Sequence, residues 1–160
     1  MIPELNPRQR AWVEVSPAAI RANARALCQH LGARTQLMAV VKADGYGHGA
    51  ETVARAALQG GATSLGVATL QEGLELRRAG LEAPVLLLSN LNEPDDLRTC
   101  LHWRLMPTLS SLREAQLCNA LAADSGRSFD VQLKIDTGMA RLGCSLSEGH
   151  QTAAELNSLE

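Results

Sequence analysis

The sequence predicts an α/β fold in which the strands of a parallel sheet alternate with helices. Short apolar runs alternate with segments of helical periodicity along the 160 residues, and no low-complexity linker interrupts them. The first run, residues 35–43 ("TQLMAVVKA"), shows no alternation of polar and apolar residues, as expected for a strand buried on both faces. Strands that alternate with helices in this way pair in parallel through right-handed crossovers.

The first helix has clear start and stop signals. After an extended piece at 11–15, Ser16 can cap the helix, Pro17 suits its first position, and Gly32 ends it. The same rhythm continues to the end of the chain, where residues 151–160 look like a helix that runs on. Further helices are expected at about 50–59, 70–79, 94–101 and 111–123. The five strands are expected at 35–43, 64–68, 84–89, 104–109 and 129–136.

Two architectures fit this order of elements: an open doubly wound sheet and part of an eight-stranded β/α barrel. Neither the dinucleotide fingerprint G-x-G-x-x-G nor a G-x-x-x-x-G-K-[ST] loop is present, which argues against a nucleotide site. In barrels, chemistry gathers at the carboxyl ends of the strands. The two unusual segments, 42–49 ("KADGYGHG") and 134–143 ("KIDTGMARLG"), both lie at such ends.

Composition argues against several classes of function. Acids and bases are interleaved to a net charge of -2, so the chain offers no basic face for nucleic acid, and no apolar run is long enough to span a membrane. The first twelve residues lack the apolar stretch of a secretory signal. Four cysteines without a C-x-x-C pair are typical of reduced thiols that form neither a disulfide nor a metal site. We therefore expect a cytoplasmic protein.

The first segment carries an amine, a phenol and an imidazole. Apolar residues before Lys42 would disfavour its charged form, and a neutral amine can form a Schiff base with a carbonyl compound; the alternative is a lysine that extends from a strand end into water. Gly45 and Gly47 allow a tight turn that returns Tyr46 toward the strand, where its hydroxyl could bind a ligand phosphate or its ring could pack on the rim. His48 is either an acid or base or a structural hydrogen-bonding group.

The second segment places Lys134 inside a strand, Asp136, Thr137 and Gly138 at its end, and Arg141 just beyond. A lysine in a buried strand is costly unless it is paired or chemically modified. Arg141 is suited to binding an oxygen anion through several donors, although it could equally be a surface ion-pair partner.

Together, these segments closely resemble the N-terminal part of alanine racemase, a pyridoxal 5'-phosphate (PLP) enzyme built as a β/α barrel followed by a β-rich domain. The match rests on residues 39–50 and 134–143, supported by 12–23 and 105–111, and it extends over essentially the whole chain. The resemblance implies that residues 1–160 are the N-terminal part of the PLP-binding barrel domain. About five of the eight strands of this TIM-type barrel would then be present, and the C-terminal β domain would be absent.

The resemblance also implies roles for four residues. Lys42 would hold PLP through a Schiff base and serve as one of two bases, the one for the D-antipode. Tyr46 would bind the cofactor phosphate, and Arg141 would bind the phenolic oxygen of the cofactor and the substrate carboxylate. Lys134 matches a lysine that is carbamylated in many members, a modification that would offset its burial and provide an anion to orient Arg141. No metal is implied.

The implied reaction is the interconversion of L-alanine and D-alanine by two bases, which supplies D-alanine for peptidoglycan, in a homodimer. Because family members are more than twice as long, the chain looks like a fragment that lacks the tyrosine acting as second base, and we expect it to be inactive alone. Two departures from the family pattern are Ala140, where glycine is common, and Gly45, where a bulkier residue is common.

Of two alternatives, one keeps PLP but changes the reaction, and the other is of a different class. Another barrel-type PLP enzyme or a small PLP carrier would use a similarly placed lysine, but the glycine-rich phosphate loop of the decarboxylases is absent, and "VKADGYGHG" is not the carriers' lysine motif. A non-catalytic half-barrel could instead bind PLP or a partner protein. The sequence leaves open the choice between alanine and serine as substrate and the carbamylation of Lys134.

Overall fold

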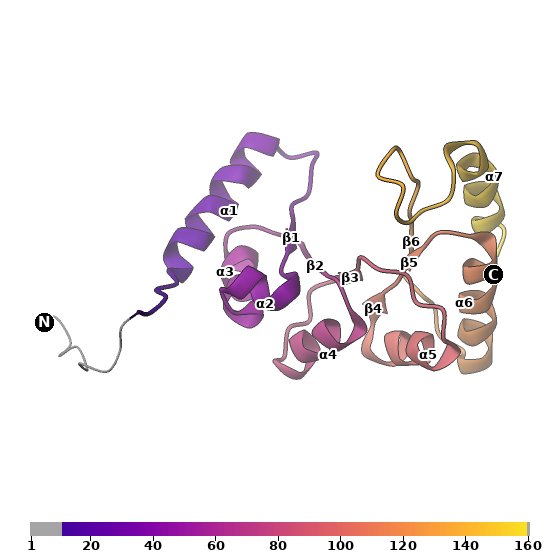
Figure 1. Cartoon of the computed structure of the whole chain (residues 1–160), viewed down its shortest axis with the longest axis horizontal. Helices are drawn as coiled ribbons and strands as arrows, with labels where there is room; N and C mark the ends of the chain where they lie inside the picture. The colour runs from indigo at the N-terminus through magenta and orange to yellow at the C-terminus, as the bar shows by residue number, and fades with distance from the viewer. Residues whose placement is uncertain (1–10, 160) are drawn as a thin grey trace, which may run out of the picture.

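The computed structural model describes residues 11–159, in which helices and short strands alternate (Figure 1). The prediction that the first twelve residues carry no secretory signal concerns mainly residues 1–10, which lie outside the described range. The helices are α1 (Pro17–Leu31), α2 (Lys42–Gly47), α3 (Ala50–Gln59), α4 (Leu70–Arg78), α5 (Pro94–Trp103), α6 (Leu112–Ser125) and α7 (Leu146–Leu156). The strands are β1 (Met38–Val40), β2 (Ser64–Val67), β3 (Val85–Leu87), β4 (Leu105–Met106), β5 (Thr108–Leu109) and β6 (Gln132–Leu133).

All neighbouring strands run parallel. One sheet has the order β1-β2-β3-β4, and β5 pairs with β6 in a second, two-stranded sheet. In Figure 1 the strands follow one another across the middle of the view, with α4 and α5 below them and α6 and α7 at the end near the C-terminus. The expected α/β fold with a parallel sheet is therefore confirmed.

The strands differ from the prediction in number and length. The expected strand at 104–109 is split into β4 and β5 at Pro107, which has no N–H group to donate to a ladder. Its carbonyl still accepts a hydrogen bond from the amide of Gln132 at 3.1 Å. The first strand covers only Met38–Val40 of the expected 35–43, because only these residues have register partners on β2, although the next amide, that of Val41, still donates to Gly66.

Helix boundaries follow their capping residues. The Ser16 hydroxyl accepts a hydrogen bond from the amide of Ala19 at 3.3 Å, and α1 ends at Gly32, which has a positive φ of 73°. Both ends of this helix are as the sequence predicts. The expected helix at the end of the chain is wrong in its extent, since α7 stops at Leu156.

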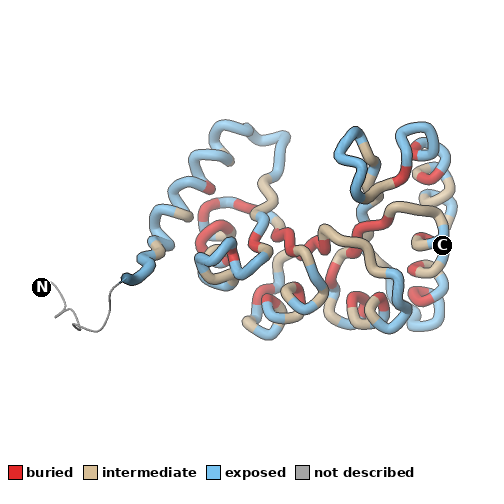
Figure 2. The backbone as a smooth tube through the Cα atoms, viewed as in Figure 1, coloured by how far each residue is buried: buried red, intermediate tan, exposed pale blue. Residues whose placement is uncertain are grey.

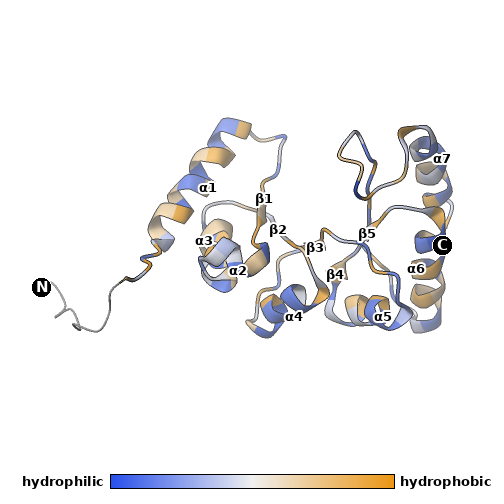
Figure 3. Cartoon of the chain, viewed as in Figure 1, coloured by the Kyte–Doolittle hydropathy of each residue, from blue (hydrophilic) through white to orange (hydrophobic). Residues whose placement is uncertain are grey.

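The main core lies between the sheet and the helices. Alternate strand residues point to the helices, which gives the buried pairs Leu65 and Val67 on β2 and Val85 and Leu87 on β3. Figure 2 shows this buried region along the strands and on the inward sides of the helices, and Figure 3 shows that the helices are apolar on one side and polar on the other. Each fully buried Leu or Val contributes roughly 1.5–3 kcal/mol, so this cluster is a major source of stability.

Two cysteines belong to this apolar interior. Cys100 is fully buried and Cys118 is nearly so. Burial raises the pKa of the Cys100 thiol to about 12 and that of Cys118 to about 11. Both thiols therefore stay protonated near neutral pH and act as small apolar side chains.

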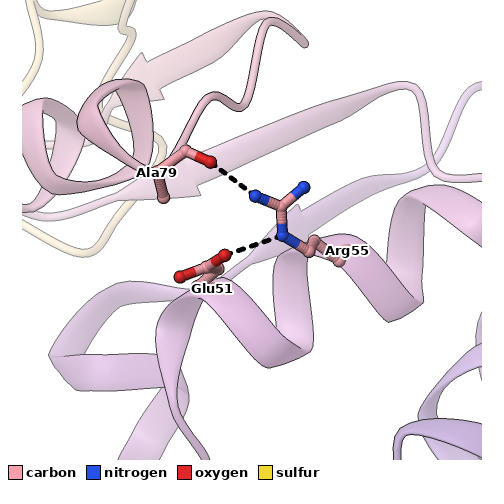
Figure 4. A network of polar contacts seen from close by, with 3 residues as sticks. All are labelled: Glu51, Arg55 and Ala79. Carbon is pink, nitrogen blue, oxygen red and sulfur yellow. Dashed lines mark hydrogen bonds and ion pairs between the residues drawn. The ribbon is translucent and has the colours of Figure 1, made fainter.

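A surface contact joins α3 to the end of α4 (Figure 4). The Arg55 guanidinium donates to Glu51 Oε1 at 2.8 Å and to the carbonyl of Ala79, the residue that follows α4. Because the Arg55 and Glu51 side chains are about half exposed, their ion pair contributes little to stability, roughly 0–1 kcal/mol. Within residues 11–159, none of the helices is both long and apolar enough to cross a membrane.

Candidate functional site

Five chain segments leave the carboxyl ends of the parallel strands of the two sheets, which we call the carboxyl edge. Lys42, Ala68, Ser89, Ser110 and Lys134 each follow the end of a strand or lie one or two residues beyond it. Hydrogen bonds link several of these ends, since the Ser89 hydroxyl donates to the carbonyl of Ala68. Both unusual sequence segments therefore start at this edge, and the two lysines of the chain are the lysines of these segments.

The segment after β1 is a left-handed helical turn. Val41 is fully buried, and its amide donates to the carbonyl of Gly66 at 2.8 Å, which continues the pairing of β1 with β2. The next residues after Lys42 all have positive φ: 52° at Ala43, 53° at Asp44, 61° at Gly45 and 55° at Tyr46. A left-handed conformation costs a non-glycine residue roughly 1–2 kcal/mol. The turn expected from the glycines is thus present. Its left-handed backbone is unfavourable by itself and must be stabilised by hydrogen bonds.

Local hydrogen bonds support this turn. Asp44 Oδ1 accepts from the amide of Ala50 at 2.8 Å, which caps α3, and the carbonyl of Asp44 accepts from the amide of Gly49 at 2.9 Å. His48 Nδ1 lies 3.1 Å from the carbonyl oxygens of both Gly45 and Tyr46. Of the two roles considered for His48, these contacts favour the structural one.

The turn brings the Lys42 amine and the Tyr46 ring together. Lys42 is half-buried, and its Nζ lies 5.8 Å from the centroid of the Tyr46 ring, within the range of a cation–π contact. Tyr46 is 60% exposed, so the residue is accessible to a ligand. An amine and a phenol at the end of a parallel strand can attach a carbonyl compound and donate a hydrogen bond to it.

Lys134 lies just after β6 and not inside a strand, which corrects the prediction. Its amide donates to the carbonyl of Leu109 at 2.8 Å, and its carbonyl accepts from the amide of Cys144 at 3.0 Å. The residue is half-buried, so its long side chain can extend to water. The premise of a lysine enclosed in a buried strand is therefore wrong.

The loop beyond Lys134 is organised by Asp136. Its Oδ1 accepts from the amides of Ala140 at 3.0 Å and Gly138 at 2.9 Å. These backbone hydrogen bonds, with a smaller effect of the positive charge of Lys134, lower the pKa of Asp136 below its ordinary value. The carboxylate is therefore ionised near neutral pH and stabilises the conformation of residues 136–140.

Arg141 is exposed, and within residues 11–159 no hydrogen bond or ion pair joins it to Lys42 or Tyr46. The structure thus brings Lys42 and Tyr46 together and places Arg141 on a separate loop beyond β6. Across the same residues, no group of three or more His, Cys, Asp or Glu side chains could hold a metal ion.

Two carboxylates at this edge were missed by the sequence analysis. Glu72 Oε1 accepts from the amide of Ala43 at 2.7 Å, and its Oε2 accepts from the amide of Ala68 at 2.7 Å. Glu114 accepts from the side-chain amide of Asn90 at 2.9 Å and from the backbone amide of Ser110. Both occupy the last position of a T-x-x-E or S-x-x-E pattern, but only Glu72 completes a capping box. A search for capping boxes would have pointed to both residues without revealing their bonds to other strand ends.

Comparison with known proteins agrees with the class that the fold and the site define, a parallel β/α domain with a lysine at a strand end. Residues 15–160 match the family model described as "Alanine racemase, N-terminal domain". The chain belongs to this family.

Relatives and solved structures extend this result. An alanine racemase from Prochlorococcus marinus is 64% identical over 89% of this chain, and one from Synechocystis is 55% identical over 85%. A crystal structure of alanine racemase from E. faecalis matches with a TM-score of 0.83 and 37% identity, over 91% of this chain and 39% of that one. A structure of the Bacillus anthracis enzyme "with bound L-Ala-P" matches with a TM-score of 0.80 and 31% identity, over 92% of this chain and 38% of its own length. The chain spans about 37% of the length of the first two relatives.

Proposed function

We propose that the protein carrying this chain is a PLP-dependent alanine racemase and that residues 1–160 form the N-terminal part of its PLP-binding barrel domain. Family membership supports the reaction, and one structural observation carries the assignment of the site. Lys42 is a half-buried amine at the end of a parallel strand, with the Tyr46 ring 5.8 Å from its Nζ. The protein would then interconvert L-alanine and D-alanine in the cytoplasm and supply D-alanine for peptidoglycan.

The residues of this turn fit the cofactor chemically. The Lys42 amine can form a Schiff base with the aldehyde of PLP, and the hydroxyl of the exposed Tyr46 can donate a hydrogen bond to its phosphate. When bound, PLP supplies an electron-accepting ring system that acidifies the α-hydrogen of an attached amino acid.

The chain's own residues supply positions and proton transfer. The Lys42 amine would hold or return the proton at the α-carbon on one face of the substrate. Arg141 would bind the substrate carboxylate and the phenolic oxygen of the cofactor, since its planar fork of donors suits oxygen anions. We assign Lys134 as a carbamylation site, where the added negative charge would orient Arg141.

The base on the opposite face would come from outside these 160 residues. Tyr46 is the only tyrosine in the chain and lies on the same turn as Lys42. We therefore propose that a tyrosine from another part of the protein reaches the site from the second subunit of a homodimer.

A trapping experiment tests the cofactor assignment. The protein is mixed with PLP, the Schiff base is reduced with borohydride, and tryptic peptides are analysed by mass spectrometry. Trypsin does not cleave at a modified lysine, so an adduct on Lys42 gives peptide 35–55, whereas one on Lys134 gives peptide 128–141. We expect the first peptide. Lys134→Arg should still give this peptide, and an adduct found only on other lysines, or none, would contradict the assignment.

Activity is tested separately, on the protein at its natural length. Exchange of the α-hydrogen of L- and D-alanine with solvent deuterium reports proton transfer on each face. Lys42→Ala should abolish exchange of D-alanine, because its base is lost, and Lys42→Arg should not restore it. The same assay with serine decides the substrate preference. A wild-type protein that traps PLP on Lys42 but exchanges neither alanine antipode would support a non-catalytic PLP-binding domain.

A further inference from the structure

We propose that Glu72 is the positioning residue for Lys42: it fixes the left-handed turn that carries the lysine and thereby determines where the amine meets its cofactor. This inference rests on the proposed function of Lys42. It assigns a role to a side chain on α4 that does not itself belong to the turn.

The geometry of the Glu72 carboxylate supports this role. Its Oε1 accepts from the backbone amide of Ala43, the residue directly after Lys42, at 2.7 Å. Its Oε2 accepts from the amides of Ala68 at 2.7 Å and Thr69 at 3.0 Å, where β2 ends and α4 begins. One half-buried carboxylate therefore joins the chain after β1 to the chain after β2.

A second capping box in the chain shows which of these bonds belong to helix capping and which does not. The box at the start of α7 pairs Ser145 with Glu148, and among residues 11–159 the carboxylate of Glu148 accepts only from the amide and hydroxyl of Ser145. The box at the start of α4 pairs Thr69 with Glu72 in the same way. The bond from Ala43, which comes from a residue 29 positions away, has no counterpart at Glu148. It is therefore a separate function of Glu72.

The turn needs such a bond. Ala43 has a φ of 52°, a conformation that is unfavourable for alanine, and the hydrogen bonds of Asp44 and His48 all join residues within 42–50. The Glu72 contact is the side-chain bond that ties the turn to another strand end. Lys42 is thus fixed on both sides, by the bond from Val41 to Gly66 and by the bond from Ala43 to Glu72. Correct placement of a reacting amine strongly affects its reactivity.

Two substitutions separate capping from positioning. In Glu72→Gln, the remaining carbonyl oxygen can still accept from Ala68 and Thr69, but the amide group would direct N–H donors at the N–H of Ala43. Capping is kept and the bond to the turn is lost. In Thr69→Ala, the hydroxyl cap of α4 is lost while both oxygens of Glu72 remain. Glu148→Gln is the matched control for the change of charge at a capping box.

The variants are compared as the protein at its natural length, with two measurements. Amide hydrogen exchange at Ala43 reports the turn itself, and titration with PLP followed by borohydride trapping reports its affinity for Lys42. For Glu72→Gln we expect exchange at Ala43 to be roughly tenfold faster and the affinity to be roughly tenfold weaker, as expected for the loss of one hydrogen bond to a charged group. Thr69→Ala and Glu148→Gln should lower thermal stability slightly and leave both values near those of the wild type.

The outcomes distinguish this inference from the proposed function. If Glu72→Gln folds and retains wild-type exchange at Ala43 and wild-type affinity, or if Thr69→Ala weakens PLP binding as much, Glu72 is only a helix cap and the inference is wrong. If the wild-type protein forms no adduct on Lys42, the proposed function is wrong. The positioning role is then wrong as well, even if hydrogen exchange at Ala43 shows that Glu72 holds the turn.

Discussion

The two lysine-bearing strand ends are held in place in different ways. The turn after β1 depends on a contact from α4, since the amide of Ala43 donates to Glu72, 29 residues away. The loop after β6 is held by contacts within itself: Asp136 accepts from residues two and four positions on, and Cys144 pairs with Lys134. The position of Lys42 is therefore a property of the assembled sheet, whereas the loop that carries Arg141 is determined largely by its own sequence.

Gly143→Ala should have the largest effect, because it breaks the local packing of the loop. Gly143 has a φ of 114°, and an added Cβ atom would lie 2.7 Å from the amide nitrogen of Asp136. Backbone strain and overlap together should lower the free energy of unfolding by about 2–4 kcal/mol, measured by urea denaturation. The control is Gly138→Ala, where φ is 131° but nothing lies within 4 Å; it should cost only the strain, roughly 1–2 kcal/mol. Equal losses would contradict the packing argument.

Asp44→Ala tests the local support of the turn that carries Lys42. It removes the acceptor for the amide of Ala50 at the start of α3 and should cost about 1 kcal/mol in thermal or urea unfolding. Asp44→Asn should recover most of this loss, because its side-chain oxygen can accept the same bond and asparagine tolerates a left-handed backbone. An asparagine variant as unstable as the alanine variant would show that the charge, and not the hydrogen bond, matters.

Ala140→Gly should have a smaller and opposite effect. Ala140 has a φ of 54°, and glycine would relieve roughly 1–2 kcal/mol of strain while losing about 0.4–1 kcal/mol to the greater freedom of the unfolded chain. We expect a net stabilisation of about 0–1.6 kcal/mol, centred on about 0.8 kcal/mol. Ala43→Gly, at a φ of 52° in the other segment, should behave alike if both sites carry only backbone strain. Destabilisation by Ala43→Gly alone would show that its methyl group also contributes.

Acid titration of the loop should produce the smallest effect, confined to a few amides. The folded pKa of Asp136 lies below its ordinary value, so its stabilising contribution is present above about pH 3.9 and is lost as the pH falls through the lowered value. Protection of the Gly138 and Ala140 amides from hydrogen exchange should therefore still be present at about pH 3.9, the ordinary pKa of an aspartate. It should disappear only when the pH falls further, through the lowered pKa of Asp136. Asp136→Asn should give protection that does not change over this range. Loss of protection in the wild type already near about pH 5 would contradict the assignment.

Much of the fold could be predicted from the sequence because its signals are local. The helix starting after Ser16 and ending before Gly32 was correct at both ends, since capping residues act on their own helix. The strands were less accurate. Pairing of β1 starts only where β2 starts, at Met38 and Ser64, and stops at Val40, just before the turn, so β1 covers fewer residues than its apolar run. Pro107 divides a strand that the apolar pattern treats as one.

The sequence singled out candidate site residues but not their geometry. The glycines around Tyr46 indicated a tight turn, yet the left hand of that turn and the contact of Tyr46 with Lys42 depend on three-dimensional packing. Lys134 was misplaced, because the apolar run around it extends beyond the two residues that pair in β6. Glu72 was missed because its pattern identifies a helix cap and gives no sign of a partner on another strand.

By itself, the sequence determined the family, the parallel α/β class and the two ends of α1, and it singled out the residues to which we assign the chemistry, because these depend on residue type and on neighbours within a few positions. Only the tertiary structure decided which backbone amides share the Glu72 carboxylate, how Lys42 is oriented, and that Lys134 follows a strand and is half-buried. The physical reason is the same in each case. These features arise from hydrogen bonds between residues far apart in the chain, which form only once the strands have paired.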